Sequence, residues 1–436
     1  MTMRMNRRSF LKLPVVLPFT AFSSASQSRE HYFQYEGVLG TSFDLIVWTS
    51  DSIVAKRVCG SIQQEIERLR SILDTRDPLS EISSWISGAL RMPSPDLQNV
   101  FTAYEYWEQH TGGIISIRPG GPDTAISIDA LGKAYIIDRV AALARKTSPA
   151  IAGLLLNIGG DIVVSGRGCT INIADPEQPY ENALPVAAIH LENGAVATSG
   201  TYARGAHLID PRTGQALATS AAATVVARDA VTANALATTL CVSSHSYDAL
   251  QLVESIPGAE ALRIVSGVAE RTLGFTRLER PLVVQASPAT NWPSNYRLTV
   301  TIPLTSGRST KRPYVAVWVE DASGRLIRSL ALWGNKSKYY ADLSTAWNLT
   351  RGDNKPFHAV TRATRPPGKY ELVWDGLDNE NKPVPLGTYR ITVETNQERG
   401  AYGKQTGTIL LGDMPSSITL PATANFDPVV VQYGPK

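Results

Sequence analysis

Cysteine is scarce in this chain, charge of one sign is not in excess, and long apolar runs are missing. The three cysteines among 436 residues, Cys59, Cys169 and Cys241, are odd in number and far apart in sequence. This pattern argues against a disulfide framework and shows no metal-binding spacing, so we expect small buried side chains. The formal net charge of +3 is too small to indicate binding to nucleic acid or to an anionic membrane.

Beyond the N-terminal segment, no stretch is apolar for the roughly 20 residues that a transmembrane helix needs. The mature chain is therefore predicted to have no transmembrane segment. Hydrophobic residues at 43% and charged residues at 19% are ordinary for a folded protein. The length predicts two to three domains, each able to bury its own core.

The first 28 residues have the pattern of an export signal. Arg7 and Arg8 are followed by an apolar pair and a lysine, by a short and mildly apolar run over residues 13–22, and by small residues over 23–25. A charged region, a brief apolar region and a small-residue cleavage zone in this order are typical of a signal peptide. The paired arginines predict the twin-arginine pathway and a periplasmic location. The alternative is a basic tail with an accidental arginine pair.

Residues 30–285 alternate short apolar runs with helical patterns. Residues 43–48 (FDLIVW) predict a strand, and residues 52–72 place apolar side chains on one face of a helix. Further predicted elements are helices over 97–110 and 134–145, two short strands within 154–164, and a strand that becomes an Ala-rich helix over 225–242. Interleaved helices and strands predict an α/β or α+β domain.

The pattern changes near residue 285. Residues 286–296 are rich in Pro, Ser and Asn and predict a linker. Beyond it helical periodicity disappears, and turn signals separate alternating runs. Strands are predicted over residues 296–302, 314–320, 326–333, 369–374 and 387–394. Short strands at this spacing predict an all-β, Ig-like sandwich over residues 297–436, with Trp and Tyr side chains in its core or, alternatively, on a partner-binding face.

Several short motifs follow one another between residues 37 and 272. They are GT at 40–41, DTRDPLSE at 74–81, TGGIIS at 111–116, LGKAYIID at 131–138, NIGGD at 157–161, ATSG at 197–200, HLIDPRTG at 207–214 and NALAT at 234–238. Each motif alone is weak, but their order resembles the ApbE-type flavin transferases. The second part, with WDG at 374–376 and GTY at 387–389, looks like an uncharacterised periplasmic domain often fused to these enzymes.

The resemblance implies a reaction. Such enzymes split FAD and attach its FMN half to a Thr hydroxyl of an exported or membrane redox protein through a phosphoester, releasing AMP. Phosphoryl transfer requires neutralised phosphate charge and an in-line hydroxyl, and Mg²⁺ bound by a few oxygen ligands usually contributes the neutralising charge. The alternatives are a non-catalytic flavin-binding or partner-docking protein that has lost its metal site and, on the second domain alone, an adhesion-like module.

The resemblance also implies roles for individual residues. His207 would accept or orient the proton of the attacking hydroxyl, unless it is an ordinary surface side chain on a β-turn. Lys133 would contact the FAD phosphates, unless it is a solvated lysine at a helix start. The residues implied to bind FAD are Leu39, Gly40, Thr41, Arg76, Ile114, Ile115, Ser116, Ser127, Lys133, Thr198, Ser199, Gly200, Leu208 and Ile209. The residues implied to bind the metal are Ala130, Asn234, Ala237 and Thr238.

The sequence departs from the family's pattern where carboxylates are expected. Ser116, Ser127 and Asn234 each stand at a position where family members have an aspartate. An Asn oxygen can bind Mg²⁺ but brings no charge, so we expect weaker metal binding. Asp129 supplies the missing charge if residues 127–129 are extended, but not if the helix has already begun. The NIGGD motif fits a tight strand connection and a close backbone approach to flavin equally well.

Overall fold

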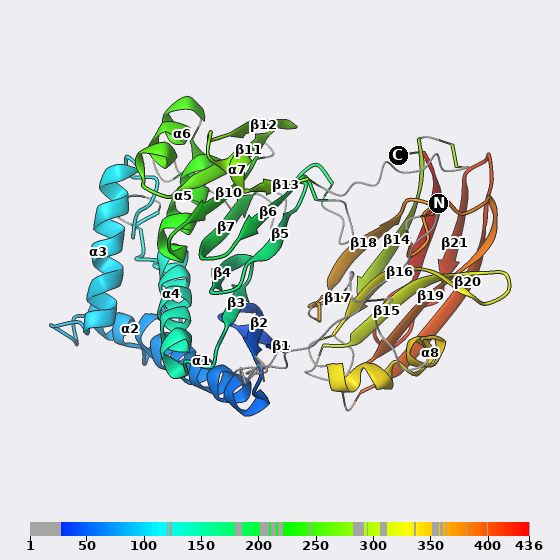
Figure 1. Ribbon diagram of the computed structural model, residues 1–436, viewed down its shortest axis with the longest axis horizontal. Helices are drawn as coiled ribbons and strands as arrows, with labels where there is room; N and C mark the ends of the chain where they lie inside the picture. The colour runs from blue at the N-terminus through cyan, green and yellow to red at the C-terminus, as the bar shows by residue number, and fades with distance from the viewer. Residues whose placement is uncertain are drawn as a thin grey trace, which may run out of the picture.

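The computed structural model describes residues 28–119, 121, 124–178, 185–200, 209–210, 215–216, 221–243, 246–281, 292–293, 295–305, 312–334, 337–350, 357, 361–362, 364–380, 382–398 and 400–435. They form two bodies, each built around its own buried apolar side chains (Figure 1). The first is an α/β body and the second consists almost entirely of strands, which confirms the two predicted fold classes. No helix formed by these residues combines the length and apolarity needed to cross a membrane.

An eight-stranded sheet with the order β1-β2-β3-β4-β7-β10-β11-β12 forms the middle of the first body, and all its neighbouring strands are antiparallel. Phe43, Leu45 and Val47 alternate toward the core in β2, as the pleat of a strand requires. The strands are β1 (Arg29–Val38), β2 (Thr41–Thr49), β3 (Gly153–Ile158), β4 (Asp161–Ser165), β7 (Gly194–Gly200), β10 (Ala221–Ala227), β11 (Glu260–Val265) and β12 (Val268–Arg271).

Helices cover one face of this sheet (Figure 1). They are α1 (Ser52–Leu73), α2 (Glu81–Ile86), α3 (Pro95–His110), α4 (Asp129–Thr147), α5 (Ala230–Val242) and α6 (Ser246–Ser255). Asp51, Ser94 and Asp229 accept backbone N–H bonds at the starts of α1, α3 and α5, so each of these helices has a side-chain N-cap. Ile53, one of the apolar residues expected on the buried face of α1, is 66% exposed, because it lies on the opposite side of the helix from the face that Val54, Val58 and Ile62 bury.

A second, smaller sheet covers the other face. It has the order β13-β6-β5, with β5 (Cys169–Ile173), β6 (Ala187–Leu191) and β13 (Glu279–Arg280), and α7 (Phe275–Leu278) adds Phe275 to this layer. Figure 1 shows β5, β6 and β13 on the side of the main sheet opposite α3 and α4. The first body therefore has three layers. All three thiols are free, as expected, and Cys59 and Cys241 are buried as predicted, whereas Cys169 is only half-buried.

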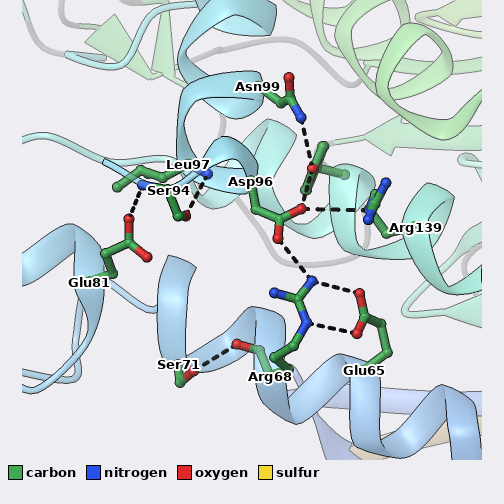
Figure 2. A network of polar contacts seen from close by, with 10 residues as sticks. Glu65, Arg68, Ser71, Glu81, Ser94, Asp96, Leu97, Asn99 and Arg139 are labelled. Carbon is green, nitrogen blue, oxygen red and sulfur yellow. Dashed lines mark hydrogen bonds and ion pairs between the residues drawn. The ribbon is translucent and has the colours of Figure 1, made fainter. Parts of the chain in front are cut away.

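A network of charged side chains joins three helices (Figure 2). Asp96, in the first turn of α3, accepts hydrogen bonds from Arg68 of α1 at 2.9 Å and from Tyr135 of α4 at 2.6 Å. Arg139 of α4 lies 3.6 Å from the same carboxylate, and Glu65 holds Arg68 through two bonds of 2.7 and 2.8 Å. Burial alone would raise the pKa of Asp96, but the bonds from Tyr135 and Arg68 outweigh it and lower that pKa. The network fixes the start of α3 against α1 and α4.

The second body is a sandwich of two sheets, with the orders β18-β14-β22-β21 and β17-β16-β15-β19-β20. Trp333, Trp374 and Tyr433 are buried between them, which confirms the predicted aromatic core. Trp292, within the predicted linker, packs in this core with its ring 5.0 Å from those of Trp374 and Tyr433. The strands are β14 (Tyr296–Leu304), β15 (Tyr314–Asp321), β16 (Leu326–Trp333), β17 (Thr361–Arg362), β18 (Gly368–Trp374), β19 (Gly387–Asn396), β20 (Tyr402–Leu411), β21 (Ser416–Leu420) and β22 (Val429–Pro435).

Two short helices that the sequence pattern does not predict accompany the sandwich. A 3₁₀ helix, η1 (Ser337–Asp342), and α8 (Ser344–Leu349) lie against the outer face of the five-stranded sheet, over Trp318. Six residues are too few for a periodic apolar pattern. The N-terminus of α8 also lacks a local side-chain cap. The fully buried Glu394 of β19 replaces that cap by accepting the N–H groups of Thr345 and Ala346, both at 2.8 Å.

Candidate functional site

Three of the motifs meet at one point in the first body. The ammonium of Lys133, in the second turn of α4, lies 2.6 Å from Oδ2 of Asp161, the first residue of β4. Asn234 of α5 donates from Nδ2 to the same oxygen at 3.3 Å. The side chain of Asp161 is 4% exposed and that of Lys133 is 23% exposed. We call this arrangement the Lys133–Asp161–Asn234 cluster.

The cluster is electrically balanced. A buried carboxylate is strongly disfavoured unless a positive charge or hydrogen bonds compensate it, and Lys133 and Asn234 supply both. An ammonium has three N–H donors, so Lys133 can hold Asp161 and still donate to a bound anion. The predicted phosphate-binding lysine is thus held near the sheet, with part of its side chain accessible to solvent.

Hydroxyl groups from neighbouring elements lie beside the cluster. Thr238 follows Asn234 by four residues on α5, so both side chains are on one face of the helix. The hydroxyl of Thr238 lies 3.2 Å from that of Ser199 on β7, and Thr198 bonds Thr224 of β10 at 2.8 Å. The structure therefore brings the ATSG and NALAT motifs together, whereas Ala237 is fully buried in the core.

The NIGGD turn positions Asp161. Gly159 and Gly160 have φ values of 62° and 95°, a left-handed conformation that favours glycine. Asn157 fixes the turn, because its Oδ1 accepts the N–H of Gly160 at 3.0 Å and its Nδ2 donates to Asp44 at 3.2 Å. A Cβ on Gly159 would lie 2.7 Å from the side chain of Thr41. Thr41 of the predicted Gly40–Thr41 motif, at the start of β2, therefore packs against Gly159.

The start of α4 settles the alternative left open for Asp129. The helix begins at Asp129, and the side chain of Asp129 is exposed, as is the next residue, Ala130. The hydroxyl of Ser127 accepts the N–H of Asp129 at 3.5 Å, a local turn contact. The extended arrangement that would let Asp129 replace the charge missing at Ser127 is therefore wrong.

Other predicted FAD-binding residues lie apart from the cluster in the contacts that the described residues make. Ser116 donates to Glu108 at 2.8 Å and accepts the N–H of Arg118 at 3.1 Å. Ile114 and Ile115 are buried, and Arg76 is 74% exposed and paired with Asp74 at 3.2 Å.

The HLIDPRTG motif is only partly described. His207 and Leu208 lie outside the described residues. Ile209 begins the short strand β8 (Ile209–Asp210), which pairs with β9 (Gln215–Ala216). Leu39 and Gly40 form the left-handed β1–β2 turn, and Gly200 ends β7, opposite Ala222 of β10.

Asp161 is the site residue that the sequence did not assign. The NIGGD pattern predicts a glycine turn, and it indicates no role for the carboxylate at its end. The available signal was an acidic residue at the start of an otherwise apolar strand, because a buried acid needs a partner. Nothing in the local pattern identified Lys133, 28 residues earlier, as that partner.

The donor groups near the cluster fit a weakly held Mg²⁺. No group of three His, Cys, Asp or Glu side chains that could hold a metal occurs within the described parts of the chain. However, Asp161, Asn234 and Thr238 offer carboxylate, amide and hydroxyl oxygens, and Mg²⁺ usually takes only one or two carboxylates besides water and phosphate oxygens. Ala130 and Ala237 offer no side-chain donor.

Comparisons with known proteins follow the same division of the chain. Residues 116–263 match the model of the ApbE family, and residues 295–427 match a family described as "Predicted periplasmic protein (DUF2271)". These matches confirm the resemblance stated for both parts. Among the curated proteins, none matches the chain.

Solved structures resemble the first body. The ApbE protein of Thermotoga maritima is 21% identical, with a TM-score of 0.50, over 58% of this chain and 100% of that one. The flavin transferase ApbE of Vibrio cholerae is 18% identical, with a TM-score of 0.48, over 58% of this chain and 99% of that one. The flavinyl transferase ApbE of Pseudomonas stutzeri is 19% identical, with a TM-score of 0.48, over 58% of this chain and 99% of that one. At this identity, the first similarity shows a common fold.

Proposed function

We propose that this chain, whose first body matches the ApbE family, is an exported FAD:protein FMN transferase. The observation that carries the proposal is the Lys133–Asp161–Asn234 cluster. Its members come from three motifs 28 to 101 residues apart, and all three motifs belong to the pattern by which the sequence resembles flavin transferases. A purely structural α/β domain has no need for a lysine, an acid and an amide to meet at the end of a strand.

In the proposed reaction, the hydroxyl oxygen of an acceptor Thr attacks the phosphorus on the FMN side of FAD. A phosphoester bond forms, the bond from that phosphorus to the bridging oxygen breaks, and AMP leaves with the bridging oxygen and its electron pair. His207 takes the hydroxyl proton. Lys133 donates to the phosphate oxygens and offsets the charge that moves onto the leaving phosphate. Mg²⁺, when bound by Asn234 and Thr238, adds further positive charge at the pyrophosphate.

The acceptor and the location follow from the same proposal. The acceptor is an exported or membrane redox protein that presents a Thr hydroxyl. The match of residues 295–427 to a family described as periplasmic supports action in the periplasm. Arg7 and Arg8 support export by the twin-arginine pathway, which delivers folded proteins. The sandwich would then lie in the same compartment as the acceptor.

A second candidate function is flavin binding without transfer. It is favoured by the loss of carboxylates at Ser116, Ser127 and Asn234 and by the neutral state of the Asp161–Lys133 pair. Both weaken the attraction of the site for a divalent cation.

One experiment separates the two functions. The purified chain is incubated with FAD, excess Mg²⁺ and a Thr-containing acceptor, and the acceptor's mass and released AMP are measured. Transfer predicts an FMN adduct and one AMP per adduct, both reduced in Lys133→Met and kept in Asp129→Asn, which alters an exposed acid on the same helix. Tight FAD binding with no adduct and no AMP would establish the second function instead.

A further inference from the structure

We propose that Asp161 supplies the negative charge that the metal site lacks at position 234, and that Lys133 and a divalent cation compete for this carboxylate. The inference rests on the proposed function, because it concerns the metal of that reaction. It assigns a metal-binding role to the last residue of the NIGGD motif, to which the sequence pattern attaches no chemistry.

The first argument is the position of Asp161. Its Oδ2 lies 3.3 Å from Nδ2 of Asn234, so the carboxylate is within side-chain reach of the place where family members have an aspartate. Two carboxylates at this separation would repel each other and raise one another's pKa. An Asn at position 234 turns that repulsion into a hydrogen bond and leaves a single charge, on Asp161. The site therefore keeps one carboxylate, that of Asp161, beside Asn234.

The second argument is the state of the other carboxylate oxygen. Lys133 and Asn234 both contact Oδ2, and Oδ1 accepts no hydrogen bond from the described residues. Oδ1 is also not one of the fully buried acceptors that lack a partner, so it keeps some access to solvent and can accept a ligand. The hydroxyls of Thr238 and Ser199, 3.2 Å apart, add neutral oxygen donors next to Asn234. One carboxylate with neutral oxygens is a donor set that a hard divalent cation accepts.

The third argument is the ammonium of Lys133. At 2.6 Å it neutralises Asp161. A divalent cation that binds this carboxylate must weaken that contact, since both draw on the same charge. The long flexible stem of Lys133 allows the ammonium to move away, toward phosphate oxygens. Metal binding would thereby release the group that contacts the pyrophosphate.

The test uses electron paramagnetic resonance to measure the binding of Mn²⁺ to the full chain without FAD. Mn²⁺ serves as a paramagnetic probe for Mg²⁺. Asp161→Asn should weaken Mn²⁺ binding by about tenfold or more, because a charged ligand is lost. Lys133→Met should strengthen it by about threefold or more, because the competing charge is gone. Asp129→Asn, the matched control, should bind Mn²⁺ as the wild type does. Circular dichroism confirms that each variant is folded.

Lys133→Met keeps the proposal testable if Asp161→Asn does not fold. If the Lys133–Asp161 ion pair is only structural, Lys133→Met binds Mn²⁺ no better than the wild type, and that result overturns the inference. Wild-type protein that binds no Mn²⁺, or folded Asp161→Asn that binds it normally, also overturns it. If FMN is transferred in the acceptor assay but Mn²⁺ binding does not depend on Asp161, the inference fails and the proposed function stands. Mn²⁺ binding as described without FMN transfer would refute the proposed function alone.

Discussion

Asp138 should make the stability of the first body depend on pH. This half-buried residue of α4 accepts the backbone N–H groups of Ala230 and Val231, at 2.8 and 3.1 Å, and so caps α5, the helix that carries Asn234. Burial is the main cause that raises the pKa of Asp138 to about 7, and the nearby charge of Asp229 raises it further.

The raised pKa fixes the sign of the effect. In the unfolded chain the carboxyl ionises near its ordinary pKa of about 4, so the folded state holds its proton over a range in which the unfolded state has lost it. The stabilisation from this proton is complete below about pH 4 and is lost as the pH rises to about 7. Between pH 5 and pH 8 the loss is about 2–3 kcal/mol, toward the lower end because Asp138 is not fully buried.

Asp138→Asn removes the titration and keeps one oxygen acceptor. Urea unfolding at pH 5 and pH 8, followed by the circular dichroism of the helices, should show wild type and variant losing different amounts of stability. We expect the difference in unfolding free energy between variant and wild type to shift by about 2 kcal/mol in favour of the variant from pH 5 to pH 8. Asp129→Asn, an exposed acid on the same helix, is the control. Parallel pH curves for wild type and Asp138→Asn would refute the reasoning.

Three further predictions concern single side chains. Asp96→Ala should lower the stability of the first body by about 1–2 kcal/mol, since Arg68, Tyr135 and Arg139 lose their acceptor. Hydrogen exchange should rise most in the first turn of α3, and a uniform rise would contradict this. Glu394→Ala should lower the stability of the sandwich in urea unfolding by about 3 kcal/mol, because the half-buried N–H of Thr345 and the buried N–H of Ala346 lose their acceptor. A loss below about 1 kcal/mol would exclude the cap. Asn234→Asp should strengthen Mg²⁺ binding by about tenfold and, without metal, lower the melting temperature because it faces Asp161; unchanged values would refute the assignment of position 234.

The sequence predicted the elements that have a strong period or alternation. The helices near residues 52–72 and 97–110 and the five named strands of the sandwich all form near the expected bounds. It missed β1, whose pattern is mixed, and α8, which is short and is capped from a distant strand. At the site it identified Lys133, Asn234 and Thr238 but not Asp161. The role of a buried acid depends on its partner, and only the fold brings Lys133 near Asp161.

The position of α5 shows why local patterns could not place the site. This helix is rich in Ala and is buried on nearly all sides, so its periodicity does not indicate which face meets the sheet. Polar side chains from other elements hold its two ends. Asp138 of α4 accepts the first N–H groups, and Arg263 of β11 donates to the carbonyls of Leu240 and Ser243, both at 2.8 Å. A helix fixed at both ends cannot rotate, and its half-exposed face, with Asn234, is therefore held toward Asp161.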